Sequence, residues 1–156
     1  MLTIEIPGFG TLKLDHLVLD YNGTLARDGR LDPDAARLLP KLARDFRLHV
    51  VTADTFGTVE AELSGLPVEL RILRSGDHTA EKAAFVHELG AQNCVAVGNG
   101  NNDRAMLESA ALGIVILGEE GAAIETLQTA DIVVPSIGRA LELLLKPKRL
   151  VATLRR

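Results

Sequence analysis

The sequence has few aromatic residues, one cysteine and no long apolar run. Aromatic residues make up 3% of the 156 residues and Trp is missing, so we expect a core of Leu, Val, Ile and Ala. Cys94 has no partner for an internal disulfide, which is typical of proteins from a reducing compartment. No apolar stretch approaches the ~18 residues of a membrane span, and the N-terminus lacks a signal-peptide pattern. We therefore expect a cytoplasmic protein with no membrane partner.

The charge balance excludes another class of partner. The formal net charge is -4, which argues against nucleic acid or an acidic membrane surface as the main partner. Hydrophobic residues make up 47% of the chain, so disorder is not expected. The length suits a single domain with a sizeable core. Residues 147–156 are locally basic and are interpreted as a basic C-terminal tail, more typical of a solvated helix end than of a binding segment.

Apolar strands alternate with helices of about ten residues along most of the chain. This alternation predicts a three-layer, Rossmann-like α/β domain with a central parallel sheet of five or six strands and helices on both faces. We expect one domain over 1–156, with an N-terminal β-hairpin in 1–15, an α/β core in 16–146 and the tail in 147–156. The predicted core strands are 16–20, 47–52, 68–73, 94–98, 113–117 and 131–134, and the predicted helices are 33–45, 56–64, 79–89, 101–111, 120–129 and 136–145.

Two short segments carry turn signals. The first hairpin is predicted around the Pro-Gly turn of residues 7–10. A smaller hairpin is predicted over 24–31, because Asp28-Gly29 suits a tight turn with positive φ angles. Asp32 followed by a proline predicts the N-cap and first turn of a helix. The small hairpin has the size of a flap and not of a separate domain.

Polar side chains follow the predicted core strands at the points where they end. Asp20 ends the first core strand, Thr52 ends the second, and Asn99 and Asp103 follow the "CVAV" strand. In a parallel sheet, ligands bind beyond the carboxyl ends of the strands, where the strand order reverses. Lys82 lies early in a helix, where a cation opposes the helix dipole unless it has a partner. These residues are therefore expected to converge on one site.

The residue types at this edge are suited to phosphate chemistry. A strand-end carboxylate such as Asp20 can attack phosphorus and form an acyl phosphate. Thr52 offers a hydroxyl and Lys82 a positive charge to the phosphoryl oxygens. Gly23 and Thr24 are expected to expose backbone N–H groups as an anion nest. A hard cation, most suitably Mg²⁺, would lie between these oxygens and those of the 98–103 loop.

Four segments together resemble a known superfamily. "DYNGTL" at 20–25, Thr52 after an apolar strand, Lys82 near a helix start and "VGNGNND" at 97–103 are similar to the four ordered motifs of the haloacid dehalogenase (HAD) superfamily. The resemblance extends from about residue 16 to residue 134. Its C-terminal half is especially similar to the phosphorylation domain of P-type ATPases, without their membrane helices and nucleotide-binding insertion. The chain thus resembles a capless, detached and soluble version of that domain.

The resemblance implies roles for individual residues. Asp20 matches the nucleophile, Thr52 the phosphate-binding hydroxyl and Lys82 the cation that stabilises an aspartyl phosphate. It implies a Mg²⁺-dependent phosphohydrolase or phosphotransferase with a small phosphorylated substrate. The implied phosphate-binding residues are Gly23, Thr24, Thr52 and Asn102, and the implied metal ligands are Asp20, the backbone carbonyl of Asn22, Asn99 and Asp103.

Two amides depart from the superfamily pattern. Asn22 stands where the phosphatases usually carry an acid that exchanges protons, which an amide cannot do. Asn99 stands where they usually have a metal-binding carboxylate, and an amide oxygen brings no charge. Weak metal binding and slow turnover are therefore expected. The intervals between the motifs have no room for a substrate-selecting cap, and capless relatives often close their site against another subunit, so a homo-oligomer is expected to be possible.

Two other classes of function stay open at this stage. A regulatory or binding module could keep the fold after losing acids, and Asn22 and Asn99 are consistent with that. A nucleotide-binding module would use the Gly98-x-Gly100 pattern, but Asp103 stands where the third glycine of a dinucleotide fingerprint belongs. The sequence does not identify a substrate, because a cap would normally select it.

Overall fold

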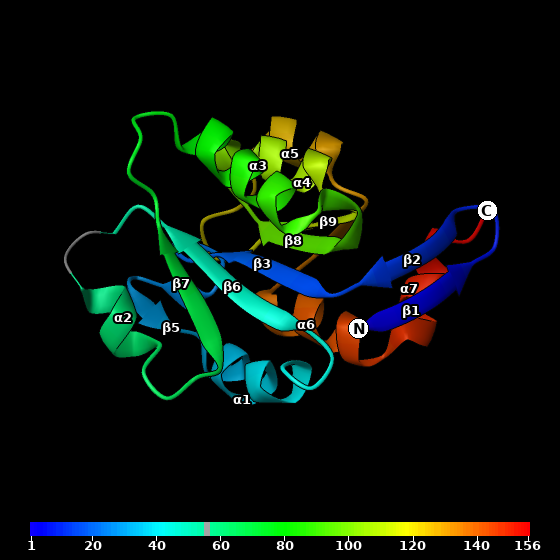
Figure 1. Ribbon diagram of the computed structural model, residues 1–156, viewed down its shortest axis with the longest axis horizontal. Helices are drawn as coiled ribbons and strands as arrows, with labels where there is room; N and C mark the ends of the chain where they lie inside the picture. Colours follow the sequence, from blue (N-terminus) through cyan, green and yellow to red (C-terminus); the bar gives the residue numbers. More distant parts are fainter. Residues whose placement is uncertain (55–56) are drawn as a thin grey trace.

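A six-stranded parallel sheet lies at the centre of the computed structural model, which describes residues 1–54 and 57–156 (Figure 1). The strand order is β10-β9-β8-β3-β6-β7, so β3 is central and the order reverses beside it. Crossovers of this kind need helices to cover both faces of the sheet. The predicted fold class is confirmed. The strands are β3 (His16–Asp20), β6 (Arg47–Thr52), β7 (Val68–Ile72), β8 (Cys94–Gly98), β9 (Leu112–Ile116) and β10 (Ile132–Val134).

Helices cover the two faces of the sheet in separate groups (Figure 1). The α3, α4 and α5 helices lie on one face, whereas α1 and α6 lie on the other. Central strands β3, β8 and β9 are buried along their whole length, as expected for a sheet with both faces covered. The helices are α1 (Pro33–Leu42), α2 (Thr58–Glu62), α3 (His78–Leu89), α4 (Arg104–Ser109), α5 (Ile124–Thr129), α6 (Ile137–Leu145) and α7 (Pro147–Leu154), with 3₁₀ turns at Ala91–Asn93 and Asn101–Asp103.

Local sequence signals account for several element ends. The Asp32 side chain accepts a hydrogen bond from the Asp34 N–H at 2.8 Å and caps α1, with proline in the first turn as predicted. Gly90 ends α3 with a φ of 91°. Asp28 and Gly29 both have positive φ angles and form the predicted tight turn between β4 (Ala26–Arg27) and β5 (Arg30–Leu31).

Several predicted helices are shorter than the sequence suggested. The helix predicted over 101–111 is a 3₁₀ turn followed by α4, which ends at Ser109. The helix predicted over 120–129 begins only at Ile124, because 118–123 is a loop fastened to Asn99. The prediction of a helix over 56–64 has its first residue outside the described part of the chain, and α2 covers 58–62. Tertiary hydrogen bonds, which local propensity cannot reveal, lie at two of these limits: the Ala123 N–H donates to the Asn99 carbonyl before α5, and the Ala111 N–H donates to the Ala91 carbonyl after α4.

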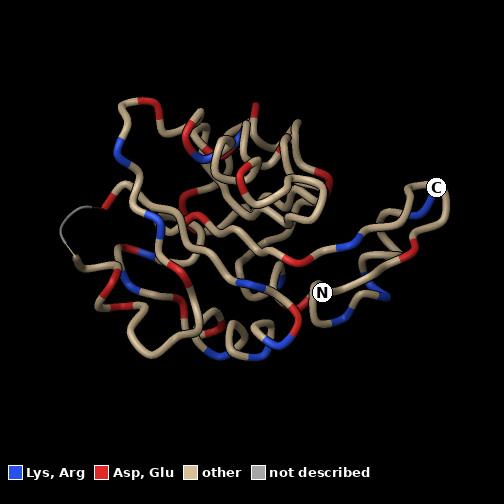
Figure 2. The backbone as a smooth tube through the Cα atoms, in the orientation of Figure 1, with Lys and Arg blue, Asp and Glu red and all other residues tan. Residues whose placement is uncertain are grey.

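The N-terminal hairpin is confirmed and extends the central strand. Strands β1 (Leu2–Ile6) and β2 (Gly10–Leu14) pair antiparallel, and β2 is separated from β3 by one residue. The hairpin and α7 lie together at the amino end of β3, opposite the carboxyl ends of the sheet (Figure 1). The basic residues of 146–156 therefore lie far from the carboxyl ends of the core strands (Figure 2). No helix within the described residues is long and apolar enough to cross a membrane.

Candidate active site

A buried lysine joins two carboxylates at the carboxyl end of the sheet. The Lys82 Nζ lies 2.7 Å from Asp20 Oδ1 and 2.7 Å from Asp103 Oδ1. Asp20 ends β3, Lys82 comes from the second turn of α3, and Asp103 comes from the loop after β8. The side chains of Lys82 and Asp103 are only 2% and 0% exposed, so this cation is held away from water by two acids. Lys82, a cation early in a helix, thus has two acidic partners, Asp20 and Asp103.

Asp103 is held by hydrogen bonds from its own loop. Its Oδ2 accepts from the N–H groups of Asn99 at 2.9 Å and Gly100 at 3.0 Å, while Oδ1 accepts from Lys82. A Cβ added at Gly98 would lie 2.5 Å from Asp103 Cγ, so the last residue of β8 must be glycine for the carboxylate to fit. Three hydrogen bonds occupy Asp103 in this arrangement. Its predicted role as a metal ligand stays a prediction.

Thr24 connects Asp20 with Asn99 across the point where the strand order reverses. Its hydroxyl lies 3.1 Å from Asp20 Oδ2 and 3.3 Å from Asn99 Oδ1. One hydroxyl proton serves two acceptors, so two oxygen atoms from different strand ends converge on one point. The Asn99 side chain accepts from Thr24 through Oδ1, and it donates through Nδ2 to the Gly121 carbonyl at 3.1 Å. Asn99 therefore also ties the 118–123 loop to the site.

Thr52 completes the group of predicted side chains. It ends β6, is buried, and its Oγ1 accepts a hydrogen bond from the Asp54 N–H at 3.2 Å. Thr52, Asp20 and Lys82 line one cavity of about 240 Å³. Side chains that are separated by about thirty residues in the sequence therefore open into one space. The full lining is Asp20, Asn22, Thr52, Ala53, Leu73, His78, Lys82, Asn99, Gly100, Asn102 and Glu120.

Burial and charge set the protonation of this cluster. Burial, together with the charge of Asp103, raises the pKa of Asp20 to about 7, although Lys82 acts in the opposite direction. Burial also disfavours the charge on Lys82, but the two carboxylates outweigh burial and its pKa is raised. Lys82 is therefore a permanent cation, whereas Asp20 is a carboxylate that burial and a neighbouring acid make more basic.

The predicted phosphate nest differs from the structure. The Gly23 N–H donates to the Ala26 carbonyl at 3.0 Å, and the Thr24 N–H donates to the Tyr21 carbonyl at 3.1 Å. The turn after β3 closes on itself, so these two N–H groups are not free donors, which corrects that expectation. The side chains of Asn22 and Asn102 are exposed and line the cavity as the sequence suggested. Their roles stay predictions.

Two ionisable residues that the sequence did not single out also line the cavity. His78 is the first residue of α3, one turn before Lys82. Glu120 belongs to the loop after β9. Helical spacing from Lys82 could have indicated His78, because residues four apart share a helix face. No sequence signal indicated Glu120, because its position depends on the hydrogen bonds between its loop and Asn99.

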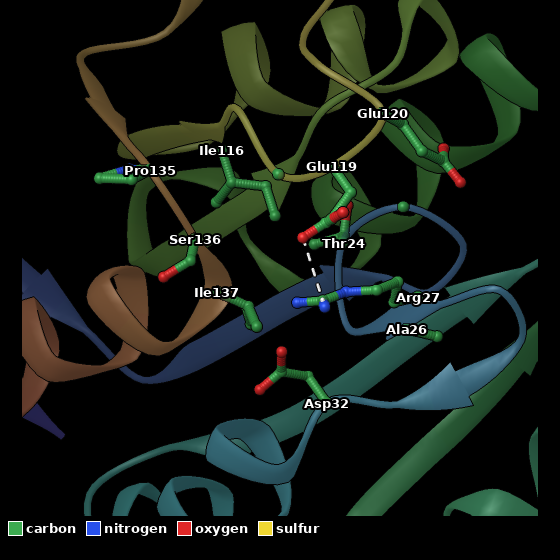
Figure 3. A pocket seen from close by; sticks show the side chains of 12 residues that line it. Thr24, Ala26, Arg27, Asp32, Ile116, Glu119, Glu120, Pro135, Ser136 and Ile137 are labelled. Carbon is green, nitrogen blue, oxygen red and sulfur yellow. Dashed lines mark ion pairs between the residues drawn. The ribbon is translucent and has the colours of Figure 1, made fainter.

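A second, smaller cavity adjoins the site on the side of the flap. It measures about 180 Å³ and lies between β4, the loop after β9 and the start of α6 (Figure 3). Arg27 of the flap pairs with Glu119 at 3.3 Å across this cavity. Thr24 lines this second cavity, and Glu120 lines both cavities. The flap therefore forms one wall of a space that adjoins the Asp20 site.

Comparison with known proteins places the chain in a structural class. Its structure matches 3-deoxy-D-manno-octulosonate 8-phosphate phosphatase from Moraxella catarrhalis, solved with magnesium ion, phosphate ion and KDO, with a TM-score of 0.72. The two share 16% identity, over 91% of this chain and 94% of that one. A proposed HAD superfamily (subfamily III A) hydrolase from Legionella pneumophila has a TM-score of 0.72 and 14% identity, over 90% and 87% of the two chains. The chain has the HAD superfamily fold, and the described residues contain no inserted cap domain.

The second resemblance is also confirmed for the fold. A zinc-transporting PIB-type ATPase has a TM-score of 0.64 and 24% identity, over 78% of this chain and 20% of the ATPase. Among curated proteins, an uncharacterized protein of Methanocaldococcus jannaschii is 44% identical over 84 residues, which are 51% of this chain and 90% of that protein. The chain belongs to the family of this archaeal protein. No protein-family model matches the sequence.

The donor set of the site fits a hard cation. Mg²⁺ prefers oxygen ligands. Here Asp20 Oδ2 and Asn99 Oδ1 converge on the single hydroxyl of Thr24, which cannot satisfy both acceptors fully. A cation beside these oxygens would satisfy them. The residues present therefore fit Mg²⁺, with one carboxylate and one amide among the convergent oxygens.

Proposed function

We propose that the protein is a Mg²⁺-dependent phosphohydrolase or phosphotransferase that acts through an aspartyl phosphate on Asp20. One observation carries the proposal: Asp20, Thr52 and Lys82 line one cavity at the carboxyl end of the sheet, with Lys82 held between Asp20 and Asp103. A buried cation beside a strand-end carboxylate is suited to a reaction that moves a phosphoryl group, whose oxygens carry negative charge. The HAD fold supports this proposal.

The proposed reaction has two displacements at phosphorus. A carboxylate oxygen of Asp20 forms a bond to phosphorus while the bond to the leaving oxygen breaks, and the leaving group takes a proton from solvent. Water then attacks the phosphorus of the acyl phosphate, which releases phosphate and restores the Asp20 carboxylate. Lys82 offsets the negative charge of the phosphoryl oxygens, and the Thr52 hydroxyl holds one of them. Asp103 keeps Lys82 and the 98–103 loop in place.

The metal would be held by Asp20, Asn99, Asp103 and the backbone carbonyl of Asn22. When bound, Mg²⁺ would supply charge stabilisation and in-line orientation of the phosphoryl group. Asn22 exposes an amide to the cavity, and an amide neither protonates a leaving group nor deprotonates water. General acid–base catalysis typically contributes 10²- to 10⁴-fold, so we expect slow turnover.

The open cavity favours a small phosphorylated substrate. No cap covers the strand ends in the described residues, and the second cavity beside Thr24 offers room for a leaving group. Another copy of the chain could close the site, as expected for a capless protein. The flap of β4 and β5 lies beside the site and is better placed for that contact than the N-terminal hairpin, which lies at the far end of β3.

The test is hydrolysis of an activated phosphate ester in the presence of Mg²⁺. We expect Asp20→Asn to abolish activity, because an amide cannot attack phosphorus. The matched control is Asp45→Asn, an exposed carboxylate in the loop between α1 and β6, which should retain wild-type activity. A panel of phosphorylated sugars, nucleotides and small acids would define the substrate class. Activity that survives in Asp20→Asn would contradict the proposal.

A second candidate is a catalytically degenerate binding or regulatory module. The observation in its favour is the loss of charge at two positions, Asn22 and Asn99, within an otherwise complete site. If the protein is such a module, the natural chain should not hydrolyse phosphate esters. Its binding of phosphate should survive the Asp20→Asn substitution. Calorimetry with inorganic phosphate, on both the natural chain and the Asp20→Asn variant, separates it from the first candidate.

A further inference from the structure

The residues predicted to hold Mg²⁺ carry little net negative charge for a divalent cation. Mg²⁺ sites in proteins usually contain one or two carboxylates together with substrate phosphate. Of the predicted ligands, Asn22 and Asn99 are neutral, and Asp20 and Asp103 share the cation Lys82. Asp20, Asp103 and Lys82 together would then bring one net negative charge to the ion. Another carboxylate that lines the same cavity would add the charge that these residues lack.

Glu120 is such a carboxylate. A Cβ placed on Gly23 would lie 2.5 Å from Glu120 Oε2 and 2.9 Å from Asn99 Nδ2. The Glu120 carboxylate thus rests against the loop after Asp20, in space that only a glycine at position 23 leaves open. Glu120 also lines the cavity that contains Asp20, Asn22 and Asn99. The adjacent Glu119 points the other way, toward Arg27 in the flap (Figure 3).

The Asn99 amide explains why Glu120 lies there. Its Nδ2 donates to the Gly121 carbonyl at 3.1 Å, and its backbone carbonyl accepts from the Ala123 N–H at 2.9 Å. These two bonds fasten the end of the loop that carries Glu120. A carboxylate at position 99 has no N–H to donate and would face the Gly121 carbonyl with like partial charge. The amide that removes a charge from position 99 is therefore the group that anchors the loop.

We propose that Glu120 supplies the negative charge that Asn99 lacks, so that the acid of the metal site has moved from the loop after β8 to the loop after β9. The inference rests on the proposed function, because it assumes that the cavity takes Mg²⁺. Glu120 acts toward the ion from across the cavity, while Asn99 contributes its amide oxygen and the loop anchor. The site then has the carboxylates of Asp20 and Glu120 facing the cation.

The test is Mg²⁺ binding by calorimetry, with metal-free protein and no substrate. We expect Glu120→Gln to weaken Mg²⁺ affinity about tenfold, at the lower end of the range for residues that support a metal site. Glu119→Gln is the matched control, because Glu119 neighbours Glu120 and pairs with Arg27 instead; its Mg²⁺ affinity should equal that of the natural chain. Equal affinities in the natural chain and in Glu120→Gln would overturn the inference, as would failure of the natural chain to bind Mg²⁺.

A second variant tests the exchange of charge between the two loops. Asn99→Asp combined with Glu120→Gln should regain most of the lost affinity, because it returns a carboxylate to the loop after β8. A folded double variant that binds Mg²⁺ no better than Glu120→Gln would contradict the exchange. These measurements are independent of hydrolysis: Asp20-dependent activity with no effect of Glu120→Gln on Mg²⁺ binding would leave the proposed function standing and remove this inference alone.

Discussion

Asn22 is the residue that most affects how fast the proposed reaction could run. It follows Asp20, the proposed nucleophile, by two positions and lines the cavity of Asp20 and Lys82 with an exposed side chain. Its neighbours Gly23 and Thr24 use their N–H groups within the turn, so the turn is held whatever side chain stands at position 22. An acid could therefore be placed there without changing the loop.

We expect Asn22→Asp to raise the rate of phosphate-ester hydrolysis by roughly 10²-fold, because a carboxyl group can protonate the leaving group and activate water. The measurement is the turnover rate with saturating Mg²⁺. Asn101→Asp is the matched control, since Asn101 is an exposed amide in the loop after β8 that does not line the cavity. A rate that rises equally in both variants would show that added negative charge, and not proton transfer, is responsible.

The sequence predicts which side chains gather at the site better than it predicts the hydrogen bonds between them. Asp20, Thr52 and Lys82 could be predicted to converge, because strand ends and helix starts of a parallel sheet meet at one edge. The Thr24 hydroxyl between Asp20 and Asn99 could not, since it depends on how the turn closes. Glu120 was also missed, because a loop after β9 reaches the site only through its bonds to Asn99.

Helix α4 and strand β9 approach each other closely at Gly113, near the amino end of the strand. A Cβ added at Gly113 would lie 2.8 Å from the Leu107 carbonyl oxygen, which is backbone and cannot move aside as a flexible side chain could. Strand β9 is fully buried and carries the loop of Glu120 at its end. Glycine at position 113 therefore sets the distance between α4 and the sheet.

We expect Gly113→Ala to destabilise the protein by about 1 to 3 kcal/mol, as is typical when a methyl group is forced into a filled core. Urea denaturation measures the free energy of unfolding. Gly76→Ala is the control, because its added Cβ meets nothing within 4 Å. If both variants unfold at the same urea concentration, the helix and strand have more room than the structure gives them.

The existence and type of the helices and strands can be predicted from the sequence, whereas their boundaries are harder to predict. Each of the six core strands was expected from an apolar run, and Asp32 and Gly90 marked real helix ends. The helices predicted over 101–111 and 120–129 are shorter in the structure than in the prediction. In the second case backbone groups near the site bond to residues distant in sequence, such as Asn99 with Ala123, and helical continuation would break those bonds.

A buried pair of histidines lies on the neighbouring strands β3 and β6. His16 Nδ1 and His49 Nε2 lie 3.0 Å apart, and His49 also faces Glu69 at 3.4 Å. Burial lowers the pKa of His49, and the neighbouring His16 and Arg47 lower it further, while Glu69 acts in the opposite direction. A lowered pKa in the folded state means that the unfolded chain binds the proton more tightly.

Stability is therefore expected to fall as the pH drops below the ordinary histidine value of 6.5 and toward the lower pKa of folded His49. The free energy of unfolding, measured between about pH 7 and about pH 5, should decrease less steeply in His49→Gln than in the natural chain. His87→Gln removes an exposed histidine at the end of α3 and should keep the full slope. An unchanged slope in His49→Gln would contradict this assignment.

The strand order also determines when the site can come into existence during folding. Strand β3 pairs with β6 about thirty residues later and with β8 nearly eighty residues later, so its two neighbours close loops of very different length. Long-range parallel pairing raises the contact order and slows folding. Asp20 can meet Thr52 soon after the first closure, but Lys82 and Asp103 reach it only once β8 has docked. A chain that has paired β3 only with β6 would therefore hold Asp20 near Thr52 without the cation Lys82, and would complete the group when β8 docks.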